Sequence, residues 1–503
     1  MKIVVNGKEK DLKAGATLKD ALYGERHVDG TLVSVHLSTD KLRTVTGDFE
    51  IETTAGTMVV ALADTPDAEL WRSLIDSETG STTRWVTKDI AAFGAFPTYI
   101  TPSREEGSYR MHDVFFSLGG HDNHTTYMMI ARRPHRRSYG AGTRLIGRVT
   151  VGRHLVGSMR EGEKILAIRP TASEVSSENV IVTKDMSYRL EEGYSIDSHI
   201  LVALDEASPA SAEQILVVGS KGYIGVSDST GSYMACRDDT DVSIPEEGHK
   251  VRGAGSVTVR CAGVGAGRIY IYRDKRQASS SHNSAGTLIR GHALAARASA
   301  GESLTVLTEP ERVLAVGMAQ ADGQKFLESL GIRQRRTGDA SDDAIIADQT
   351  PEMTMSALAL GEAETFGVPK EKVFKVALDV KDAISVNYFK KVTGLSHKPI
   401  GALKTQFAFP GMSLTTFYGD EERSKNLYPQ EPFKRCKKGD IGITNQSRPH
   451  HGLIGIRLQD SKEFGPTGEE PYGTNMVGRF AGDLKKLDLL EEDEVIYITE
   501  EEA

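Results

Sequence analysis

The sequence predicts a mainly β, multidomain protein in which one β unit is repeated. The 503 residues are 39% hydrophobic and 26% charged, a composition typical of folded domains. This length accommodates about three or four domains with separate cores. Two stretches, beginning at Asp113 and Asp440, share one pattern: an alternating strand, a polar turn ending in histidine, an aliphatic strand, a glycine loop and a hydrophobic pair before Gly-Arg.

The N-terminus predicts a hairpin and a short helix. The strand KIVV at residues 2–5 precedes Asn6 and Gly7, which favour a type I′ turn into a second strand. Thr17 is expected to cap a helix, and the strands LVSVHL and MVVAL follow. This order resembles the ubiquitin-like sulfur carriers and the TGS modules, which implies a β-grasp module over residues 1–62. Because the chain continues without the carriers' terminal Gly-Gly tail, sulfur transfer is not expected.

The repeat predicts three β units, at residues 63–180, 181–311 and 369–503. His124 and His451 lie at the same offset from Asp113 and Asp440, and Gly147 and Arg148 correspond to Gly478 and Arg479. The middle copy is more divergent, and its residues 285–287 are matched to residues 141–143. Between the second and third units, residues 312–368 read as a helix ending at Leu-Gly-Ile, a strand and a Gln-x-Pro turn, which resembles the small α+β PASTA fold.

The C-terminal unit resembles the cyclophilins in several consecutive blocks. VFKVALDVKDAISVNYFKKVTG resembles their opening strand and helix, GDIGITN their strand ending in Met-Ala-Asn, and NMVGRF their Phe-Gly-Arg-Val. His451 and Gly452 fall where those proteins have Asn-Gly. The resemblance covers residues 373–498 and implies that the repeated units are cyclophilin-like β-barrels.

The same resemblance argues against catalysis. Cyclophilins polarise the twisting prolyl amide with an arginine, and residues 404–420, KTQFAFPGMSLTTFYGD, contain none, so that electrostatic stabilisation is missing. No catalytic residue is assigned. A groove for a peptide or protein partner remains a candidate, and His451 is either a member of it or a polar cap imposed by the fold. The candidate groove residues are Phe407, Phe409, Met412, Asn445, His450 and His451.

A cluster of arginines follows the strand of the first unit. It comprises Arg132, Arg133, Arg136 and Arg137, and proline breaks this run into a loop. The run is either a solvated face or a site for an acidic partner, since guanidinium groups suit carboxylates. His121 and His124 lack the i, i+4 spacing of a helical zinc pair. The glycines before RIYIYRD precede a strand, whereas a dinucleotide-binding loop opens a helix.

Cysteine usage and charge indicate where the protein resides. Cys236, Cys261 and Cys436 are scattered, which favours a reducing compartment. Arg435, Lys437 and Lys438 flank Cys436 and are expected to lower the pKa of its thiol. No metal or cofactor motif is present, although one of these thiols could complete a cluster held by another subunit. A net charge of -9, with no signal peptide or apolar span, predicts a cytoplasmic protein without nucleic-acid or membrane partners.

Across its full length the chain resembles the methanogenesis marker protein 3 family. The phrases KKVTGLSHKPIG, LIGIRLQDSKEFGPTGE and GTNMVGRF carry the resemblance. It implies an archaeal protein associated with the assembly that reductively activates methyl-coenzyme M reductase. In that assembly other subunits carry iron–sulfur clusters, ATP and a nickel tetrapyrrole. The expected function is a non-catalytic scaffold, and the alternative is a prolyl isomerase acting on a methanogenesis protein.

Overall fold

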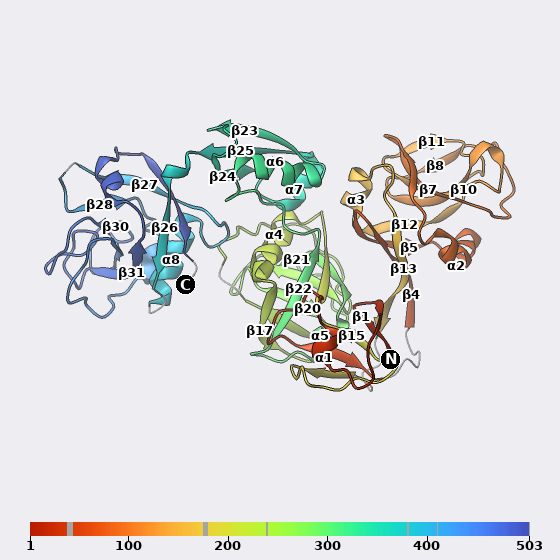
Figure 1. The fold of residues 1–503 in the computed structure, drawn as a ribbon, viewed down its shortest axis with the longest axis horizontal. Helices are drawn as coiled ribbons and strands as arrows, with labels where there is room; N and C mark the ends of the chain where they lie inside the picture. Colours follow the sequence, from red (N-terminus) through yellow and green to blue (C-terminus); the bar gives the residue numbers. More distant parts are fainter. Residues whose placement is uncertain (38–43, 175–179, 238–239, 380–381, 410, 502–503) are drawn as a thin grey trace. The chain divides into compact units, whose positions relative to one another are not determined.

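The structure is a computed structural model that describes residues 1–37, 44–174, 180–237, 240–379, 382–409 and 411–501. The chain divides into two compact units, and Figure 1 shows the helices and strands of both in sequence colours. One comprises Met1–Asp238 with Ile244–Arg312, and the other comprises Asp239–Ser243 with Val313–Ala503. Both are mainly β, as predicted. Among the described residues, no helix has the length and apolar character that a membrane span requires.

A five-stranded sheet begins the first unit. Its order is β14-β3-β15-β1-β2, with β1 (Lys2–Val5), β2 (Lys8–Asp11), β3 (Val33–His36), β14 (Val180–Thr183) and β15 (Ser195–Asp197). Asn6 and Gly7 have φ of 49° and 78°, which confirms the predicted type I′ turn. Helix α1 (Leu18–Ala21) follows Thr17, which forms the predicted cap in a reciprocal pair with Asp20.

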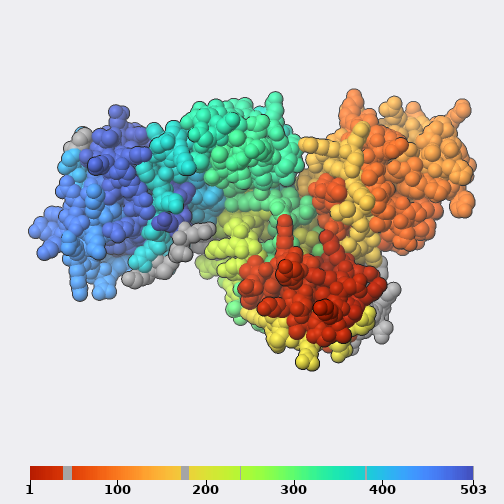
Figure 2. All heavy atoms as spheres, viewed as in Figure 1, coloured from red at the N-terminus to blue at the C-terminus, as the bar shows by residue number. Residues whose placement is uncertain are grey.

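Strands distant in sequence complete this sheet. β15 pairs in parallel with β1, and a parallel pair needs a long crossover, which here contains an entire β unit. In Figure 2 the red N-terminal atoms and the yellow atoms near residue 190 lie against one another. β4 (Thr44–Thr53) and β5 (Gly56–Leu62) pair instead with strands of the next sheet. The observed boundary therefore differs from the one expected at residue 62, and the ubiquitin-like assignment stays a prediction.

The first β unit is an eight-stranded sheet with the order β13-β4-β5-β12-β9-β10-β7-β6. Its further strands are β6 (Thr83–Val86), β7 (Ile90–Phe96), β9 (Asp113–Leu118), β10 (Thr126–Ala131), β12 (Leu145–Val151) and β13 (Ile165–Glu174). A two-stranded ribbon joins β8 (Gly107–Tyr109) to β11 (His135–Arg137). The helices are α2 (Pro66–Glu78) and α3 (Arg153–Ser158). Trp71 of α2 packs in the core with Phe93 and Phe116.

The other two units are closed seven-stranded barrels with one strand order. The middle barrel contains β16 (Ile200–Leu204), β17 (Tyr223–Ser229), β18 (Tyr233–Cys236), β19 (Ser256–Arg260), β20 (Ile269–Tyr272), β21 (His282–Arg290) and β22 (Ser303–Glu309), with α4 (Pro209–Val218) and α5 (His292–Arg297). The C-terminal barrel contains β26 (Val373–Leu378), β27 (Gly401–Phe407), β28 (Leu414–Phe417), β29 (Asp440–Thr444), β30 (Ile454–Arg457), β31 (Thr474–Phe480) and β32 (Val495–Glu500), with α8 (Ala383–Thr393).

Strand registers show which residues of the units correspond. Arg148 faces Asp113 in the first unit, and Arg479 faces Asp440 in the last, which confirms the predicted equivalence of these pairs. In the middle barrel the facing pair is Thr287 and Ser256. Residues 286 and 287 therefore correspond to 147 and 148, so the match of residues 285–287 to residues 141–143 is wrong.

Each unit places one glycine against the strand that opens it. A Cβ added to Gly147, Gly286 or Gly478 would overlap the carbonyl oxygen of Ala61, Ala203 or Ala377, respectively. Each of these alanines lies in a Val-Ala-Leu sequence, at residues 60–62, 202–204 and 376–378. The repeated tripeptide is a sequence signal for the start of each unit, although the prediction began the first unit after it.

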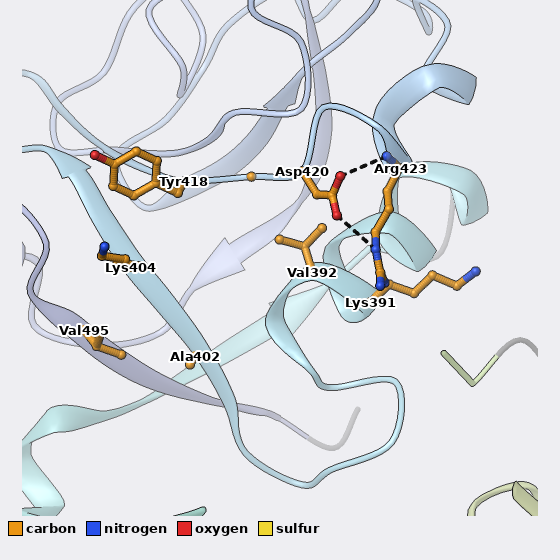
Figure 3. A pocket seen from close by; sticks show the side chains of 9 residues that line it. Lys391, Val392, Ala402, Lys404, Tyr418, Asp420, Arg423 and Val495 are labelled. Carbon is orange, nitrogen blue, oxygen red and sulfur yellow. Dashed lines mark hydrogen bonds and ion pairs between the residues drawn. The ribbon is translucent and has the colours of Figure 1, made fainter. Parts of the chain in front are cut away.

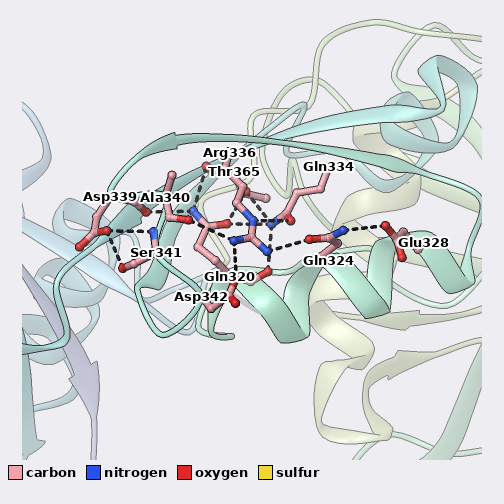
Figure 4. Close-up of polar contacts among 10 residues, drawn as sticks. All are labelled: Gln320, Gln324, Glu328, Gln334, Arg336, Asp339, Ala340, Ser341, Asp342 and Thr365. Atoms are coloured by element: carbon pink, nitrogen blue, oxygen red, sulfur yellow. Dashed lines mark hydrogen bonds and ion pairs between the residues drawn. The ribbon is translucent and has the colours of Figure 1, made fainter.

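The segment between the barrels is a small α+β module. It contains α6 (Gln320–Ser329), β23 (Arg333–Gly338), β24 (Ile345–Thr350), α7 (Thr354–Leu360) and β25 (Glu362–Val368), and α6 ends before Leu-Gly-Ile as predicted. Figure 4 shows the polar network that joins the helix to the sheet. Buried Gln320 Oε1 accepts hydrogen bonds of 2.8 Å from Gln334 Nε2 and from Thr365 Oγ1. The PASTA-like assignment stays a prediction.

Candidate protein-binding surface of the C-terminal barrel

The hairpin between β27 and β28 presents three large apolar side chains to solvent. Phe407, Phe409 and Met412 are 42%, 57% and 38% exposed. The two phenylalanine rings meet edge to face, with centroids 4.9 Å apart. Contiguous exposed apolar side chains mark association sites, whereas single ones are ordinary. The structure therefore places the three apolar residues predicted for the partner groove on one hairpin, and we call these three residues the hairpin patch.

A short helix beside this hairpin holds it in place. The backbone N–H of Gly411 donates to Asp488 Oδ1 at 3.0 Å. Asp488 belongs to η6 (Leu484–Leu489). Thr415 Oγ1 of β28 also donates to the carbonyl oxygen of Leu487 at 3.3 Å. These contacts present the patch from a supported hairpin, which lowers the conformational entropy that binding would cost.

Asn445, another predicted groove residue, lies inside the barrel wall. Its side chain is fully buried and donates to the carbonyl oxygen of Tyr472 at 2.9 Å and to Asn475 Oδ1 at 3.0 Å. Its own Oδ1 accepts from the backbone N–H of Ser447 at 3.0 Å. Because these contacts use both ends of the amide, Asn445 closes a turn and does not line a surface groove.

His451 ties its turn to the helix η5 (Arg423–Asn426). Its Nδ1 lies 2.5 Å from Ser424 Oγ, and its Nε2 lies 3.8 Å from Glu421 Oε1. The order carboxylate, imidazole and hydroxyl suggests a nucleophilic triad. Ser424 is fully buried, however, so its oxygen cannot meet a substrate. The geometry supports the polar-cap interpretation of His451, while His450 is exposed beside it.

The chain itself covers the outer face of β29 and β30. Ile454 and Ile456 point into the core, so Gly455 and Arg457 point outward. Gly455 pairs directly with Gly442 of β29, which leaves a notch without side chains. Pro466 fills this notch: a Cβ on Gly455 would overlap its carbonyl oxygen, and one on Gly442 would lie 3.1 Å from its Cγ. Arg457 was not among the residues predicted from the sequence. The alternation Ile-Gly-Ile-Arg at residues 454–457 nevertheless predicts that its side chain faces outward.

The equivalent faces of the other two units are also covered. In the first unit the outward pair is Phe115 and Met129, and Tyr109 of the β8–β11 ribbon stacks on Phe115 with ring centroids 3.9 Å apart. In the middle barrel the outward pair is Thr258 and Tyr270, and Tyr270 is only 7% exposed. In all three units, residues of the chain itself thus cover the outer face of the sheet at β9, β19 and β29.

A cleft of about 390 Å³ opens on another side of the C-terminal barrel (Figure 3). Asp420 receives two contacts from Arg423, one from its backbone N–H at 3.1 Å and one from Nε at 3.0 Å. Lys404 pairs with Asp493 at 2.7 Å and lies 5.3 Å from the centre of the Tyr418 ring. The side chains of Asp420, Arg423 and Lys404 already have partners within the barrel, so the cleft is a weaker candidate than the hairpin patch.

The arginine cluster of the first unit is used largely within the chain. Arg132 donates from Nε to the carbonyl oxygen of Val156 at 3.0 Å and from Nη1 to that of Thr87 at 2.7 Å. Arg133 pairs with Asp89, and Arg136 pairs with Glu106 at 3.2 Å. Arg137 ends β11 and is exposed. The guanidinium groups of Arg133 and Arg136 are therefore already paired with carboxylates of the same chain. An acidic partner was the other candidate for these pairings.

The pKa predicted for Cys436 is wrong in direction. Burial raises the pKa of its thiol to about 12, and the Asp440 carboxylate adds to the rise. The flanking cation Arg435 pairs instead with Asp460. Burial also raises the pKa of Cys236 to about 12, and Cys261 is partly exposed. The thiolate is the metal-binding form, and the described part of the chain contains no cluster of three or more metal-ligating side chains.

The fold and these surfaces define a mainly β, multi-barrel protein with a supported apolar patch on its C-terminal barrel. A family model described as "Putative peptidyl-prolyl cis-trans isomerase domain" matches residues 374–501. The chain belongs to the UPF0288 protein family. A UPF0288 protein of Methanothermobacter thermautotrophicus is 35% identical over 99% of this chain and 98% of its own length. One from Methanopyrus kandleri is 30% identical over 99% of each chain.

Solved structures show weaker likenesses. A cyclophilin from Hirschia baltica is 11% identical over 28% of this chain and 80% of its own, with a TM-score of 0.21. A cyclophilin-type peptidyl-prolyl cis-trans isomerase from Cryptosporidium parvum is 13% identical over 25% of this chain and 98% of its own, with a TM-score of 0.20. At these TM-scores the likenesses carry no weight for function.

Proposed function

We propose that this chain is a non-catalytic scaffold subunit of methanogenesis that acts in the assembly or ATP-dependent reductive activation of methyl-coenzyme M reductase. The hairpin patch carries the proposal, because three large apolar side chains face solvent on a supported hairpin. The resemblance to the methanogenesis marker protein 3 family supports the choice of partner. The relatives come from methanogens, including Methanothermobacter and Methanosarcina species, which supports the same setting.

The chemistry of the hairpin patch suits a protein partner. Aromatic residues and methionine are enriched at the centres of protein interfaces, where a few buried side chains supply most of the binding free energy. Phe407 and Phe409 together form such an anchor, and Met412 adapts to irregular surfaces. The patch contributes no titratable group, which fits a role in binding rather than in acid–base chemistry.

We expect replacement of the patch by serine to weaken partner capture strongly. The triple variant Phe407→Ser, Phe409→Ser, Met412→Ser removes apolar area that is already exposed, so its stability should change by no more than about 1 kcal/mol. Binding should fall at least about tenfold, as expected when hot-spot side chains are lost. The measurement is affinity purification of methyl-coenzyme M reductase and its activation subunits from cells expressing tagged wild-type or variant protein.

A matched control separates the patch from general surface hydrophobicity. Tyr99 and Val264 are each 97% exposed and lie in other units of the chain. The double variant Tyr99→Ser, Val264→Ser should capture the same subunits as the wild type. Equal recovery by the patch variant and the wild type would remove the support for this binding surface.

The alternative function is a prolyl isomerase, which the description of the matching family model favours. We expect the purified protein not to accelerate cis–trans isomerisation of an Ala-Pro test peptide. The first reason is that residues 404–420 contain no arginine, and the second is that Pro466 fills the notch on β29 and β30. A rate comparable to that of an ordinary cyclophilin at equal concentration would establish the enzyme instead.

A further inference from the structure

A cavity of about 580 Å³ opens in the first β unit, where β5 and β12 meet the β8–β11 ribbon. Its lining combines small apolar side chains with polar ones. The apolar residues are Ala61, Ala63 and Leu145, and the polar residues are Ser108, Arg110, Asp113 and Arg148. A cavity of this size, with an apolar wall and a few polar groups, is typical of a site for a small molecule.

The carboxylate of Asp113 in this lining already has its partners. Arg148 donates to its Oδ1 from Nε at 2.9 Å and from Nη2 at 2.7 Å. The backbone N–H of Arg110 donates to its Oδ2 at 2.7 Å. Asp113 is only 7% exposed, and the charge of Arg148 balances its own. This carboxylate therefore leaves the cavity open to an anion.

The ribbon directs free hydrogen-bond donors into the cavity. Tyr109 stacks on Phe115, so the side chains before and after it point to the opposite face of the ribbon, where the cavity lies. The Arg110 guanidinium and Ser108 Oγ form no hydrogen bond or ion pair with a described residue. Nη1 of Arg148 also lacks an acceptor in the described part of the chain. Two guanidinium groups and a hydroxyl thus remain available to a ligand.

The surroundings of the cavity are positively charged. Burial lowers the pKa of the neighbouring His112 to about 4, and the charges of Arg153 and Arg148 add to the fall. The imidazole is therefore neutral at pH 7. Arg153 lies 3.7 Å from Glu206, which balances its charge. The guanidinium of Arg110 then supplies the excess positive charge that an anion would neutralise.

The ion pair of this cavity recurs in the C-terminal barrel, whereas the ribbon belongs to the first unit. Arg479 Nε lies 3.9 Å from Asp440 Oδ1, at the position that corresponds to Arg148 and Asp113. The connection between β28 and β29 contains η5, whereas the connection between β7 and β9 contains β8. The ion pair is thus a feature of the shared fold, and the ribbon adds the free donors that a ligand needs.

We propose that this cavity binds a small organic phosphate, with the phosphate group on the two arginines and the carbon skeleton against the apolar wall. Phosphate fits better than carboxylate, because its three terminal oxygens can accept from both guanidinium groups and from the hydroxyl. The cavity belongs to the first compact unit and the hairpin patch to the second. The proposal therefore does not depend on the scaffold function.

Isothermal titration calorimetry of the full-length protein with phenyl phosphate tests the ligand class. Benzoate and inorganic phosphate are the matched controls, because each lacks one of the two parts that the cavity would recognise. We expect saturable binding of phenyl phosphate, at least about tenfold tighter than binding of either control. Equal affinity for phenyl phosphate and one of the controls, or no saturable binding, would overturn the proposal.

Two arginine variants locate the bound phosphate. Arg110→Ser removes a guanidinium that has no partner among the described residues, so folding should be unchanged and the affinity for phenyl phosphate should fall at least about tenfold. Arg84→Ser is the control, because Arg84 is exposed on β6, at one edge of the same sheet, and carries the same charge. Equal losses in both variants would attribute binding to net charge and refute the site.

A third variant tests the apolar wall without changing any charge. Ala63→Phe places an aromatic ring in the cavity, just beyond the end of β5. The affinity for phenyl phosphate should fall at least about tenfold, while tryptophan fluorescence during urea unfolding verifies that the first unit is folded. Unchanged affinity in a folded Ala63→Phe variant would place the ligand outside the cavity. If this variant does not fold, the comparison of Arg110→Ser with Arg84→Ser decides alone.

Discussion

Glu78→Gln is expected to stabilise the first β unit by several kcal/mol at pH 8.5 and to change its stability little at pH 5. Glu78 is fully buried, and Trp71 Nε1 donates to its Oε2 at 2.7 Å. Its Oε1 is buried without a hydrogen-bond partner among the described residues. Burial raises the pKa of Glu78 from 4.5 to about 8, against the lowering effect of the Trp71 hydrogen bond.

The sign of the pH dependence follows from that raised pKa. Below about pH 4.5 the carboxyl group is protonated in both the folded and the unfolded chain, so its ionisation costs nothing. As pH rises toward 8 the unfolded chain releases the proton while the folded chain retains it, and the free energy of unfolding falls. The total loss is on the order of 3–5 kcal/mol. The side-chain amide introduced by Glu78→Gln keeps the acceptor for Trp71 and cannot ionise, so this loss disappears.

Urea unfolding at pH 5 to 9 measures this effect. Trp71 and Trp85 are the two tryptophans of the chain, and both belong to the first unit, so their fluorescence reports its unfolding selectively. Asp76→Asn is the matched control, because Asp76 lies on the exposed face of the same helix. If the wild type and Glu78→Gln show parallel stability profiles over this range, Glu78 is not the buried titrating group.

Gly147→Ala is expected to destabilise the first unit by about 3 kcal/mol. The added methyl group would overlap the carbonyl oxygen of Ala61 and lie 2.9 Å from Leu62 Cα. These are main-chain atoms of β5, so relief requires the strand to move, and overpacking of this kind costs about 1–3 kcal/mol or more. The same close approach at Gly286 and Gly478 predicts comparable losses in the two closed barrels.

Gly157→Ala provides the control in the same unit. Gly157 lies within α3, is exposed, and has no atom within 4 Å of an added Cβ. Alanine in a helix is favoured over glycine by about 0.5–1 kcal/mol, so this variant should be equal to the wild type or slightly more stable. Tryptophan fluorescence during urea unfolding follows both variants. A loss for Gly147→Ala no larger than the change for Gly157→Ala would refute the close packing of β12 on β5.

Local features of the fold were predictable from sequence because neighbouring residues determine them. Asn6 and Gly7 adopt positive φ at small cost, and Thr17 offers its side chain to the first turn of α1. The alternation of Ile441 and Ile443 with small or polar residues predicted a strand with one buried face. The repeat also predicted pairings between distant residues, because two stretches with the same pattern adopt the same strand register. Arg148 faces Asp113 in the first unit, and Arg479 faces Asp440 in the last.

The candidate site was only partly predictable. Phe407, Phe409 and Met412 were recognised by their apolar character, and the hairpin displays all three. Asn445 was assigned to the same groove from the resemblance of GDIGITN to the cyclophilin strand that ends in Met-Ala-Asn, but its amide turns inward to Tyr472 and Asn475. The thiol of Cys436 was assigned a low pKa from its cationic sequence neighbours. Burial dominates instead, because desolvation depends on what packs around a group in space.

The sequence by itself determined the mainly β class, the repetition of one unit and the N-terminal hairpin, because each depends on side-chain type and on a period of a few residues. Only the tertiary structure decided that β15 completes the sheet begun by β1 and that Pro466 fills the notch at Gly442 and Gly455. Both bring together segments that are separated along the chain. Which segments meet is determined by complementary shape and by the need to cover main-chain groups, and neither can be read from a local sequence pattern.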